Sequence, residues 1–256
     1  MKPLQLSIKT TSLCNRRCKN CSVISWMDAN PNFHTSIKQV ENLIKYSKES
    51  NYHWEYILLS GGEPLLWKNC LEGTKLLYES GICSRLILLT NGLQIKSETL
   101  RFIDKIIRNV HEFRISMYND NTRNIALAEE YFGKFKNPYG NPTLNVVDRQ
   151  IHLKPVTWGE AFGDSPTDLL PADCTCKAYS MLGDEVWYCG PMHSIILKES
   201  KDFRNLESFM WESYKTKIAY GKHFLNYIKV YEDNFISCEY CISNAKVAKH
   251  LKRAEA

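Results

Sequence analysis

The chain has 256 residues, of which 44% are hydrophobic and 24% are charged, and its formal net charge at pH 7 is +5. This composition is ordinary for a globular protein, and the length suits one large domain or one large domain with a small addition. The scattered lysines and arginines do not indicate nucleic-acid binding, no window approaches 18 apolar residues, and the first residues lack a signal-peptide pattern. We therefore expect a cytoplasmic protein with neither a membrane nor a nucleic acid as partner.

Strand-like and helix-like segments alternate over the first 155 residues. Polar–apolar alternation and short apolar runs predict strands, whereas apolar residues three or four positions apart predict helices. In chain order the expected elements are strand 4–9, a helix from a cap at Thr35 or Ser36 to 49, strand 54–60, helix 69–80, strand 85–90, helix 97–108, strand 112–118, helix 121–132, and short strands 144–148 and 151–155. Repeated strand–helix units predict parallel strands with right-handed crossovers, in a partial barrel or an open sheet.

The alternation stops after residue 155. Residues 156–173 are rich in glycine, proline and aspartate and predict a long loop. A hairpin is expected from 179–182 and 185–189, then a long helix over 205–227 and a basic terminal helix. The sequence thus predicts a core unit, 1–155, and a second unit, 156–256.

Several expected strands have one polar face. The polar positions that share a face within their strand are Gln5, Ser7 and Lys9; Arg114, Ser116 and Tyr118; and His152 and Lys154. A purely structural barrel fills its interior with branched apolar side chains, so a polar interior predicts a bound polar ligand. An exposed sheet edge is the alternative interpretation.

The ten cysteines are the unusual feature of the composition. Cys70 and Cys83 stand alone on expected helices and are predicted to be small buried hydrophobic residues. Cys14, Cys18 and Cys21 have the spacing C-x3-C-x2-C. Three thiolates on one short loop can hold three irons of a [4Fe–4S] cluster and leave the fourth iron open, as a catalytic site requires. Zinc with a distant fourth ligand is the alternative.

This spacing, at the end of a first strand, resembles the defining motif of the radical S-adenosylmethionine (SAM) superfamily. Gly61-Gly62-Glu63-Pro64 follows about 40 residues later, at the end of the second strand, and resembles the GGEP motif of that superfamily. The resemblance covers about residues 1–155. It implies an α/β fold, a partial (β/α)6 barrel, and reductive cleavage of SAM to methionine and a 5′-deoxyadenosyl radical that takes a hydrogen atom from the substrate.

The resemblance also implies cofactor-binding roles. The GGEP segment would receive the amino group of SAM, since glycines permit close backbone approach. Ser116 would lie near the SAM ribose or carboxylate, and Asn91 is a further candidate, with a simple Asn91-Gly92 turn as the alternative. Asn20 stands where the superfamily usually has an aromatic residue that packs at the adenine. Arg17 and Lys19 are interpreted as solvating the loop.

A second group of cysteines lies in the C-terminal part of the chain: Cys174 or Cys176, then Cys189, Cys238 and Cys241. A cysteine before a hairpin, another after it and a late C-x2-C resemble the auxiliary-cluster domains of radical SAM enzymes. The shortened "twitch" form fits better than the longer SPASM form, so the resemblance implies two [4Fe–4S] clusters in all, with structural zinc as the alternative. The layout is similar to that of small twitch enzymes typified by 2-deoxy-scyllo-inosamine dehydrogenase.

Three functions compete at this stage. The first is oxidation of a small polar molecule such as a sugar or cyclitol, with Tyr118, His152, Lys154 or His193 as base and Arg114 binding the substrate. The second is modification of a ribosomally made peptide, which is weakened because no leader-binding domain is expected before the first strand. The third, an electron carrier or structural zinc protein, leaves the GGEP motif unexplained. A flavodoxin or ferredoxin, both acidic, is the expected reductant.

Overall fold

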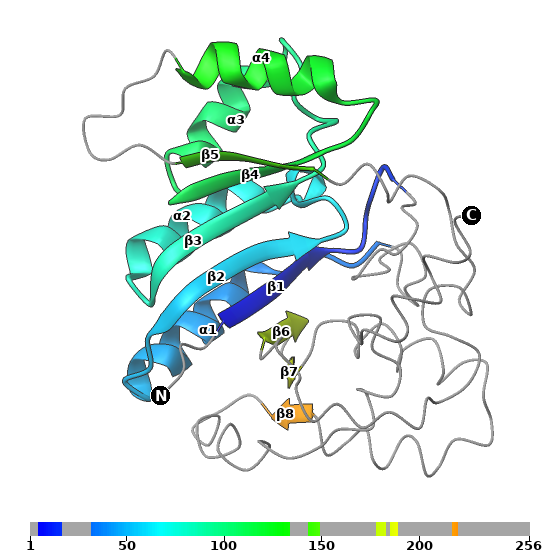
Figure 1. Cartoon of the computed structure of the whole chain (residues 1–256). Coiled ribbons are helices and arrows are strands. Elements are labelled where there is room, and N and C mark those ends of the chain that lie inside the picture. Colours follow the sequence, from blue (N-terminus) through cyan, green and yellow to red (C-terminus); the bar gives the residue numbers. More distant parts are fainter. Residues whose placement is uncertain are drawn as a thin grey trace, which may run out of the picture.

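The computed structural model describes residues 5–16, 32–133, 143–148, 178–182, 185–188 and 217–219. Within them the strands form one sheet in the spatial order β5-β4-β3-β2-β1-β6-β7-β8 (Figure 1). The elements are β1 (Gln5–Thr11), α1 (Ile37–Glu49), β2 (Trp54–Gly61), the 3-10 helix η2 (Pro64–Leu66), α2 (Cys70–Ser80), β3 (Cys83–Thr90), α3 (Leu100–Ile107), β4 (Glu112–Met117), α4 (Thr122–Gly133), β5 (Thr143–Asp148), β6 (Ala178–Leu182), β7 (Glu185–Tyr188) and β8 (Lys217–Ala219).

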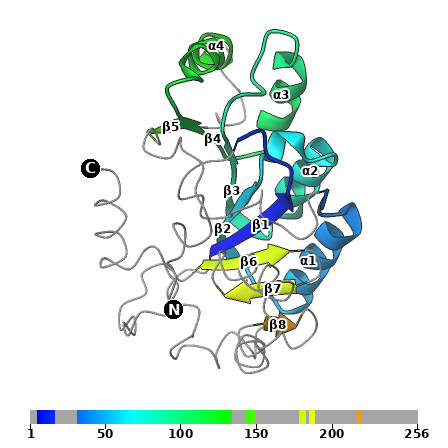
Figure 2. The same ribbon diagram turned by 90° about the vertical axis from the view of Figure 1, so that its right-hand side faces the viewer.

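The strands from β5 across to β6 are all parallel to their neighbours. Helices connect β1 to β2, β2 to β3, β3 to β4 and β4 to β5, as parallel strands require, and α1, α2 and α3 lie along one face (Figure 2). The predicted α/β class with strand–helix units is therefore confirmed. None of the helices in the described ranges is long and apolar enough to cross a membrane.

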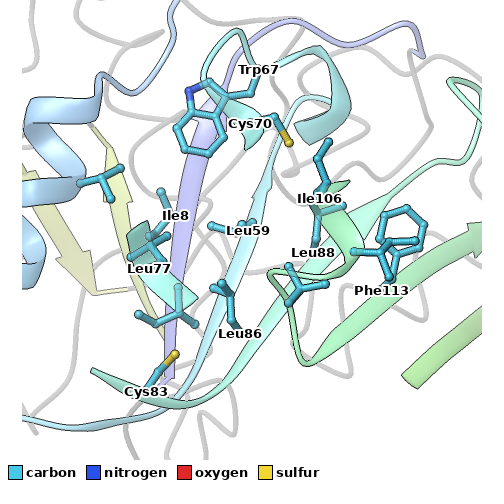
Figure 3. Close-up of a cluster of buried hydrophobic side chains, with 14 of the residues drawn as sticks. Ile8, Leu59, Trp67, Cys70, Leu77, Cys83, Leu86, Leu88, Ile106 and Phe113 are labelled. Carbon is cyan, nitrogen blue, oxygen red and sulfur yellow. The ribbon is translucent and has the colours of Figure 1, made fainter. Parts of the chain in front are cut away.

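The hydrophobic core lies between the sheet and these helices. It takes every second residue of a strand, for example Leu6 and Ile8 of β1, or Phe113 and Ile115 of β4, all at most 1% exposed (Figure 3). Because side chains alternate along a strand, the residues between them lie on the opposite face, called here the inner face. Within β1 and β4 the predicted polar residues therefore lie on the inner face, as expected, whereas Tyr118 follows the end of β4.

The helix ends agree closely with the sequence pattern. Ser36 caps α1 in a capping box, in which its hydroxyl accepts from the Gln39 N–H and the Gln39 side chain accepts from the Ser36 N–H. Gly81 ends α2 in the left-handed conformation, which glycine adopts without steric cost. Of the two predicted caps for α1, the structure selects Ser36.

Cys83 lies on a strand, not on a helix. Strand β3 begins two residues earlier than expected, because Cys83 pairs with Trp54 of β2. The prediction of a helical Cys83 is wrong, but its burial is confirmed: Cys70 is 2% exposed and Cys83 7%. Burial raises the pKa of both thiols, that of Cys83 to about 11, so neither favours the thiolate form.

The predicted hairpin is confirmed, and it also extends the sheet. Strands β6 and β7 pair antiparallel, with Leu182 opposite Glu185, while β6 runs parallel to β1 on the edge that β2 leaves free. The expected strand 151–155 lies outside the described residues, and the unit boundary at 155 stays a prediction. The prediction of an unbroken helix over 205–227 is wrong, because residues 217–219 within that range form β8, which pairs antiparallel with β7.

Candidate functional site

The carboxyl ends of β1 and β2 approach so closely that side chains are excluded between them. Gly61 has φ +118°, and a Cβ on Gly62 would lie 2.0 Å from the carbonyl oxygen of Leu13. The N–H of Gly62 donates to Thr11 at 2.7 Å, and that of Glu63 donates to Leu13 at 2.7 Å. The two glycines are thus needed to attach the segment before Cys14 to the end of β2.

The cysteine-bearing loop leaves and rejoins the sheet at one place. The Ser12 N–H donates to the carbonyl of Phe33, and the Phe33 N–H donates to the Ser12 hydroxyl at 3.0 Å. The Thr11 hydroxyl also donates to Phe33, at 2.9 Å. The described ends of the loop are therefore fixed, whereas Cys18 and Cys21 lie outside the described residues.

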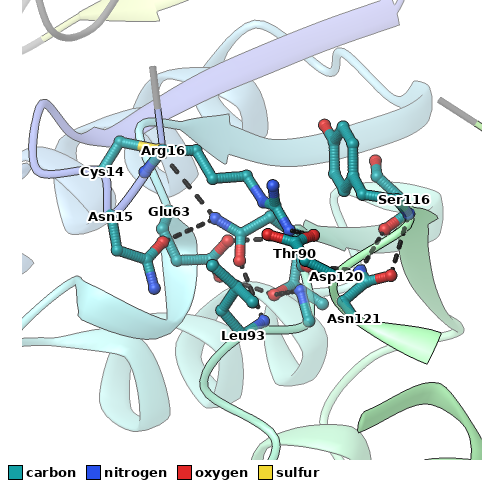
Figure 4. Close-up of polar contacts among 12 residues, drawn as sticks. Cys14, Asn15, Arg16, Glu63, Thr90, Leu93, Ser116, Asp120 and Asn121 are labelled. Atoms are coloured by element: carbon teal, nitrogen blue, oxygen red, sulfur yellow. Dashed lines mark hydrogen bonds and ion pairs between the residues drawn. The ribbon is translucent and has the colours of Figure 1, made fainter. Parts of the chain in front are cut away.

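Cys14 lies at the carboxyl edge of the sheet with its sulfur facing N–H donors. The Arg16 N–H is 3.4 Å from its Sγ, and the Asn91 amide nitrogen is 4.0 Å away (Figure 4). The Asn91 amide also donates to Asn15 at 2.7 Å. A partly exposed sulfur facing N–H groups is a suitable environment for a thiolate, and N–H donors to thiolate sulfur help set the reduction potential of a cluster.

Glu63 of the GGEP segment is a structural brace. It is 1% exposed and accepts hydrogen bonds from the Thr90 hydroxyl at 2.6 Å and the Asn91 N–H at 2.7 Å. Burial raises the pKa of Glu63 above its ordinary value, although these hydrogen bonds partly oppose the rise. The carboxyl group ties the end of β2 to the end of β3 and so holds Asn91 beside Cys14.

Asn121 connects the ends of β3 and β4. It is fully buried, its amide donates to the carbonyls of Asn91 and Ser116, both at 2.7 Å, and its Oδ1 accepts from the Tyr118 N–H. Asn91, Ser116 and Tyr118, all predicted site residues, are thereby brought to one edge of the sheet. The segment also forms a turn, since the Leu93 N–H donates to Asn91 Oδ1 at 3.0 Å and Gly92 has φ +74°; the cofactor-binding role of Asn91 stays a prediction.

Arg16 reaches from the cysteine loop to the end of β4. Its guanidinium carbon lies 4.0 Å from the centre of the Tyr118 ring, within cation–π distance, and its Nη2 pairs with Asp120. Figure 4 shows Arg16 extended between the Cys14 segment and Asp120. Tyr118 therefore lies beneath a cation and is 8% exposed.

Charged groups gather on the inner face nearer the amino ends of the strands. The carboxylate of Glu112, whose side chain is 3% exposed, accepts from Arg114 Nε at 2.7 Å and pairs with Arg85 at 2.5 Å. The Asn145 amide donates to it at 3.1 Å. Burial alone would raise the pKa of Glu112, but the hydrogen bonds from Arg114 and Asn145 and the two arginine charges outweigh it, so the pKa is lowered. Arg114, predicted to bind substrate, has Glu112 as partner.

We expect Glu112→Gln to unfold about 2 kcal/mol more easily at pH 7, since it loses charge-assisted hydrogen bonds. A lowered folded-state pKa gives stability that is present above the unfolded pKa and lost as pH falls through the folded one. The difference from wild type should therefore shrink below about pH 4.5. Urea unfolding of cluster-free protein at pH 7 and pH 4 measures this, with exposed Glu98→Gln as the control that changes little. A constant difference at both pH values would contradict the assignment.

The other predicted site residues cannot be placed. These are Asn20, His152, Lys154, His193, Cys18, Cys21, Cys174, Cys176, Cys189, Cys238 and Cys241, all outside the described residues. Within the described ranges, no group of three or more His, Cys, Asp or Glu side chains could hold a metal ion. Of the cysteines proposed as cluster ligands, Cys14 is therefore the one that lies within the described residues.

Sequence reasoning missed Arg16, Asp120, Asn121 and Glu112. An arginine inside a C-x3-C-x2-C spacing was a visible signal, but its partners lie more than a hundred positions away along the chain. Asn121 was visible only as the start of a helix. Glu112 lies two positions before Arg114, on the same face of a strand, which is a weak signal for an ion pair.

Residues 8–130 match the family model described as the Radical SAM superfamily. Among curated proteins, one of Methanocaldococcus jannaschii, named as a glycyl-radical enzyme activating enzyme, is 28% identical over 148 residues. That alignment covers 53% of this chain and 54% of the relative, so the chain spans about half the length of the relative it matches.

Solved structures of similar shape include BtrN in an open conformation, at 16% identity and a TM-score of 0.45, covering 86% of this chain and 89% of BtrN. Histidine-tagged anSMEcpe with bound AdoMet has 16% identity, a TM-score of 0.47, and coverage of 93% and 79%. Streptococcus suis SuiB bound to the precursor peptide SuiA has 12% identity, a TM-score of 0.41, and coverage of 75% and 61%.

Proposed function

We propose, from the match of residues 8–130 to the Radical SAM superfamily model, that this chain is a member of that superfamily. We further propose that it is an enzyme that binds a [4Fe–4S] cluster on Cys14, Cys18 and Cys21 and cleaves SAM reductively. The observation that carries the proposal is the position of Cys14 beside the Gly61-Gly62 contact, with N–H groups of Arg16 and Asn91 facing its sulfur.

The described residues fit such a cluster. The sulfur of Cys14 is partly exposed, unlike those of Cys70 and Cys83, and its two N–H neighbours match a thiolate acceptor. Once bound, a reduced [4Fe–4S] cluster with an open iron supplies the electron that cleaves SAM. The chain contributes by holding the loop ends together and by aligning Asn91 through Glu63 and Asn121.

The GGEP segment suits the amino group of SAM. The N–H groups of Gly62 and Glu63 already donate hydrogen bonds to the carbonyl oxygens of Thr11 and Leu13. The groups of the segment that can accept from an ammonium group are therefore its carbonyl oxygens. Those of Glu63 and Pro64 already accept from the N–H groups of Leu66 and Trp67. Ser116, at 6% exposure near the end of β4, remains our candidate for the ribose or carboxylate.

Reconstitution and turnover of the wild-type protein test the proposal. After anaerobic reconstitution with iron and sulfide, addition of SAM and dithionite should produce 5′-deoxyadenosine. We expect about eight irons per chain if two four-iron clusters form, and about four if only the N-terminal one does. Iron-loaded protein that forms no 5′-deoxyadenosine would refute the activity.

For the substrate we propose a small polar molecule such as a sugar or cyclitol, oxidised after hydrogen abstraction. The support is the inner face, where Ser7 and Ser60 share a hydrogen bond at 2.6 Å and Lys9, Arg114 and Ser116 face the same side. Tyr118, His152, Lys154 and His193 remain the candidate bases. A ribosomally made peptide is the alternative substrate, which a precursor-peptide gene beside the coding gene would favour.

We also propose that the C-terminal cysteines hold an auxiliary [4Fe–4S] cluster. It would accept one electron from the substrate radical that remains after hydrogen abstraction and loss of a proton, with a flavodoxin or ferredoxin as external reductant. Cys241→Ala should then retain 5′-deoxyadenosine formation, because the SAM site is intact, and lose at least about 100-fold in substrate oxidation, on the scale of metal-site mutations. Product analysis by mass spectrometry with each candidate substrate class measures it. Unchanged product formation would show that this cysteine serves structure alone.

A further inference from the structure

Arg16 is a buried cation in the cysteine loop. Its side chain is only 7% exposed, and its backbone N–H faces the sulfur of Cys14. A guanidinium removed from water is costly unless opposite charges and hydrogen-bond acceptors replace the lost water. The partners of Arg16 should therefore account for this cost.

The partners in the described ranges account for only part of it. Asp120 pairs with Nη2, but its side chain is 56% exposed, so water screens much of its charge. Tyr118 offers the face of its ring and no hydrogen-bond acceptor. The Nε–H of Arg16 is buried without a hydrogen-bond partner among the described residues. Among the residues that the structure describes, the charge and the Nε–H of Arg16 are therefore only partly compensated.

We propose that Arg16 is a positioning residue whose positive charge complements the cluster thiolates and favours the reduced cluster. This inference rests on the proposed cluster at Cys14, Cys18 and Cys21. Taking up an electron makes a cluster one unit more negative, so a fixed cation nearby stabilises the reduced state and raises the reduction potential. The ion pair with Asp120 and the stacking on Tyr118 hold that charge in place.

The same geometry assigns the opposite effect to Asp120. Its carboxylate opposes the arginine charge at the same edge of the sheet. Asp120→Asn removes the negative charge but keeps a hydrogen-bond acceptor. Arg16 should then keep its hydrogen bond to residue 120, while its positive charge is less compensated. A structural role alone would give both substitutions effects of the same sign.

Redox titration of the reconstituted full chain, followed by electron paramagnetic resonance of the signal that SAM perturbs, tests the proposal. Arg16→Met should lower the ratio of reduced to oxidised cluster at fixed solution potential about tenfold, or about 59 mV for one electron. This is the order expected for one unit charge about 10 Å away at an effective dielectric constant of about 20. Arg16→Lys should recover most of the shift, and Asp120→Asn should shift the ratio upward.

An unchanged potential in Arg16→Met at wild-type iron content, or equal shifts in Arg16→Met and Arg16→Lys, would overturn the inference. If Arg16→Met does not load iron, the Asp120→Asn variant alone tests the inference. A reduction potential that falls or stays unchanged in Asp120→Asn would contradict the charge effect. Failure of the proposed function looks different, because wild-type protein would then show no SAM-sensitive signal at all.

Discussion

Cys14→Ala should abolish 5′-deoxyadenosine formation and remove about four irons per chain. The substitution deletes the one proposed ligand that lies among the described residues, at the carboxyl edge of the sheet. Two remaining thiolates would not hold a cubane whose fourth iron must stay open. The sulfur lost is the one that faces the N–H groups of Arg16 and Asn91. Product formation is measured by chromatography after incubation with SAM and dithionite, and iron by colorimetric assay.

Cys83→Ala is the matched control. It removes the same thiol group from a buried position in β3, where the raised pKa of about 11 disfavours the thiolate. We expect wild-type iron content and SAM cleavage, at a cost of about 1 kcal/mol in stability for the small cavity. If Cys14→Ala kept SAM cleavage, or if both variants lost it equally, Cys14 would not be a cluster ligand.

The sheet was predictable because its signals are local. Alternation placed Leu6 and Ile8 on the core face and Ser7 and Lys9 on the other, and the structure agrees. The start of β3 was predicted two residues late because exposed Ser84 separates buried Cys83 from the apolar run that follows Arg85. Pairing of β6 with β1 was not predictable, since contacts between strands far apart in sequence leave no periodic signal in either.

The site was predictable only as far as its motifs extend. The spacing that contains Cys14 and the glycines of the GGEP segment predicted a site at the ends of the first two strands, and the structure brings the Cys14 segment and these glycines together. The support of Asn91 by Glu63 and Asn121 depends on the register of β2, β3 and β4. Such a brace follows from tertiary geometry, because each residue alone is an ordinary turn or helix-start residue.

Gly62→Ala should lower SAM cleavage about 100-fold, the scale of a displacement of about 1 Å at a reacting centre. The new Cβ would lie 2.0 Å from the Leu13 carbonyl oxygen and 2.5 Å from its carbon, and backbone atoms cannot rotate away as a flexible side chain could. The segment before Cys14 must therefore shift. Gly133→Ala, at the end of α4 with no atom within 4 Å of its Cβ, is the control that should retain activity and stability. SAM affinity measured by equilibrium dialysis, together with the yield of 5′-deoxyadenosine, distinguishes the two variants. Wild-type SAM affinity in Gly62→Ala would mean that the close approach of Gly62 to Leu13 does not shape the SAM site.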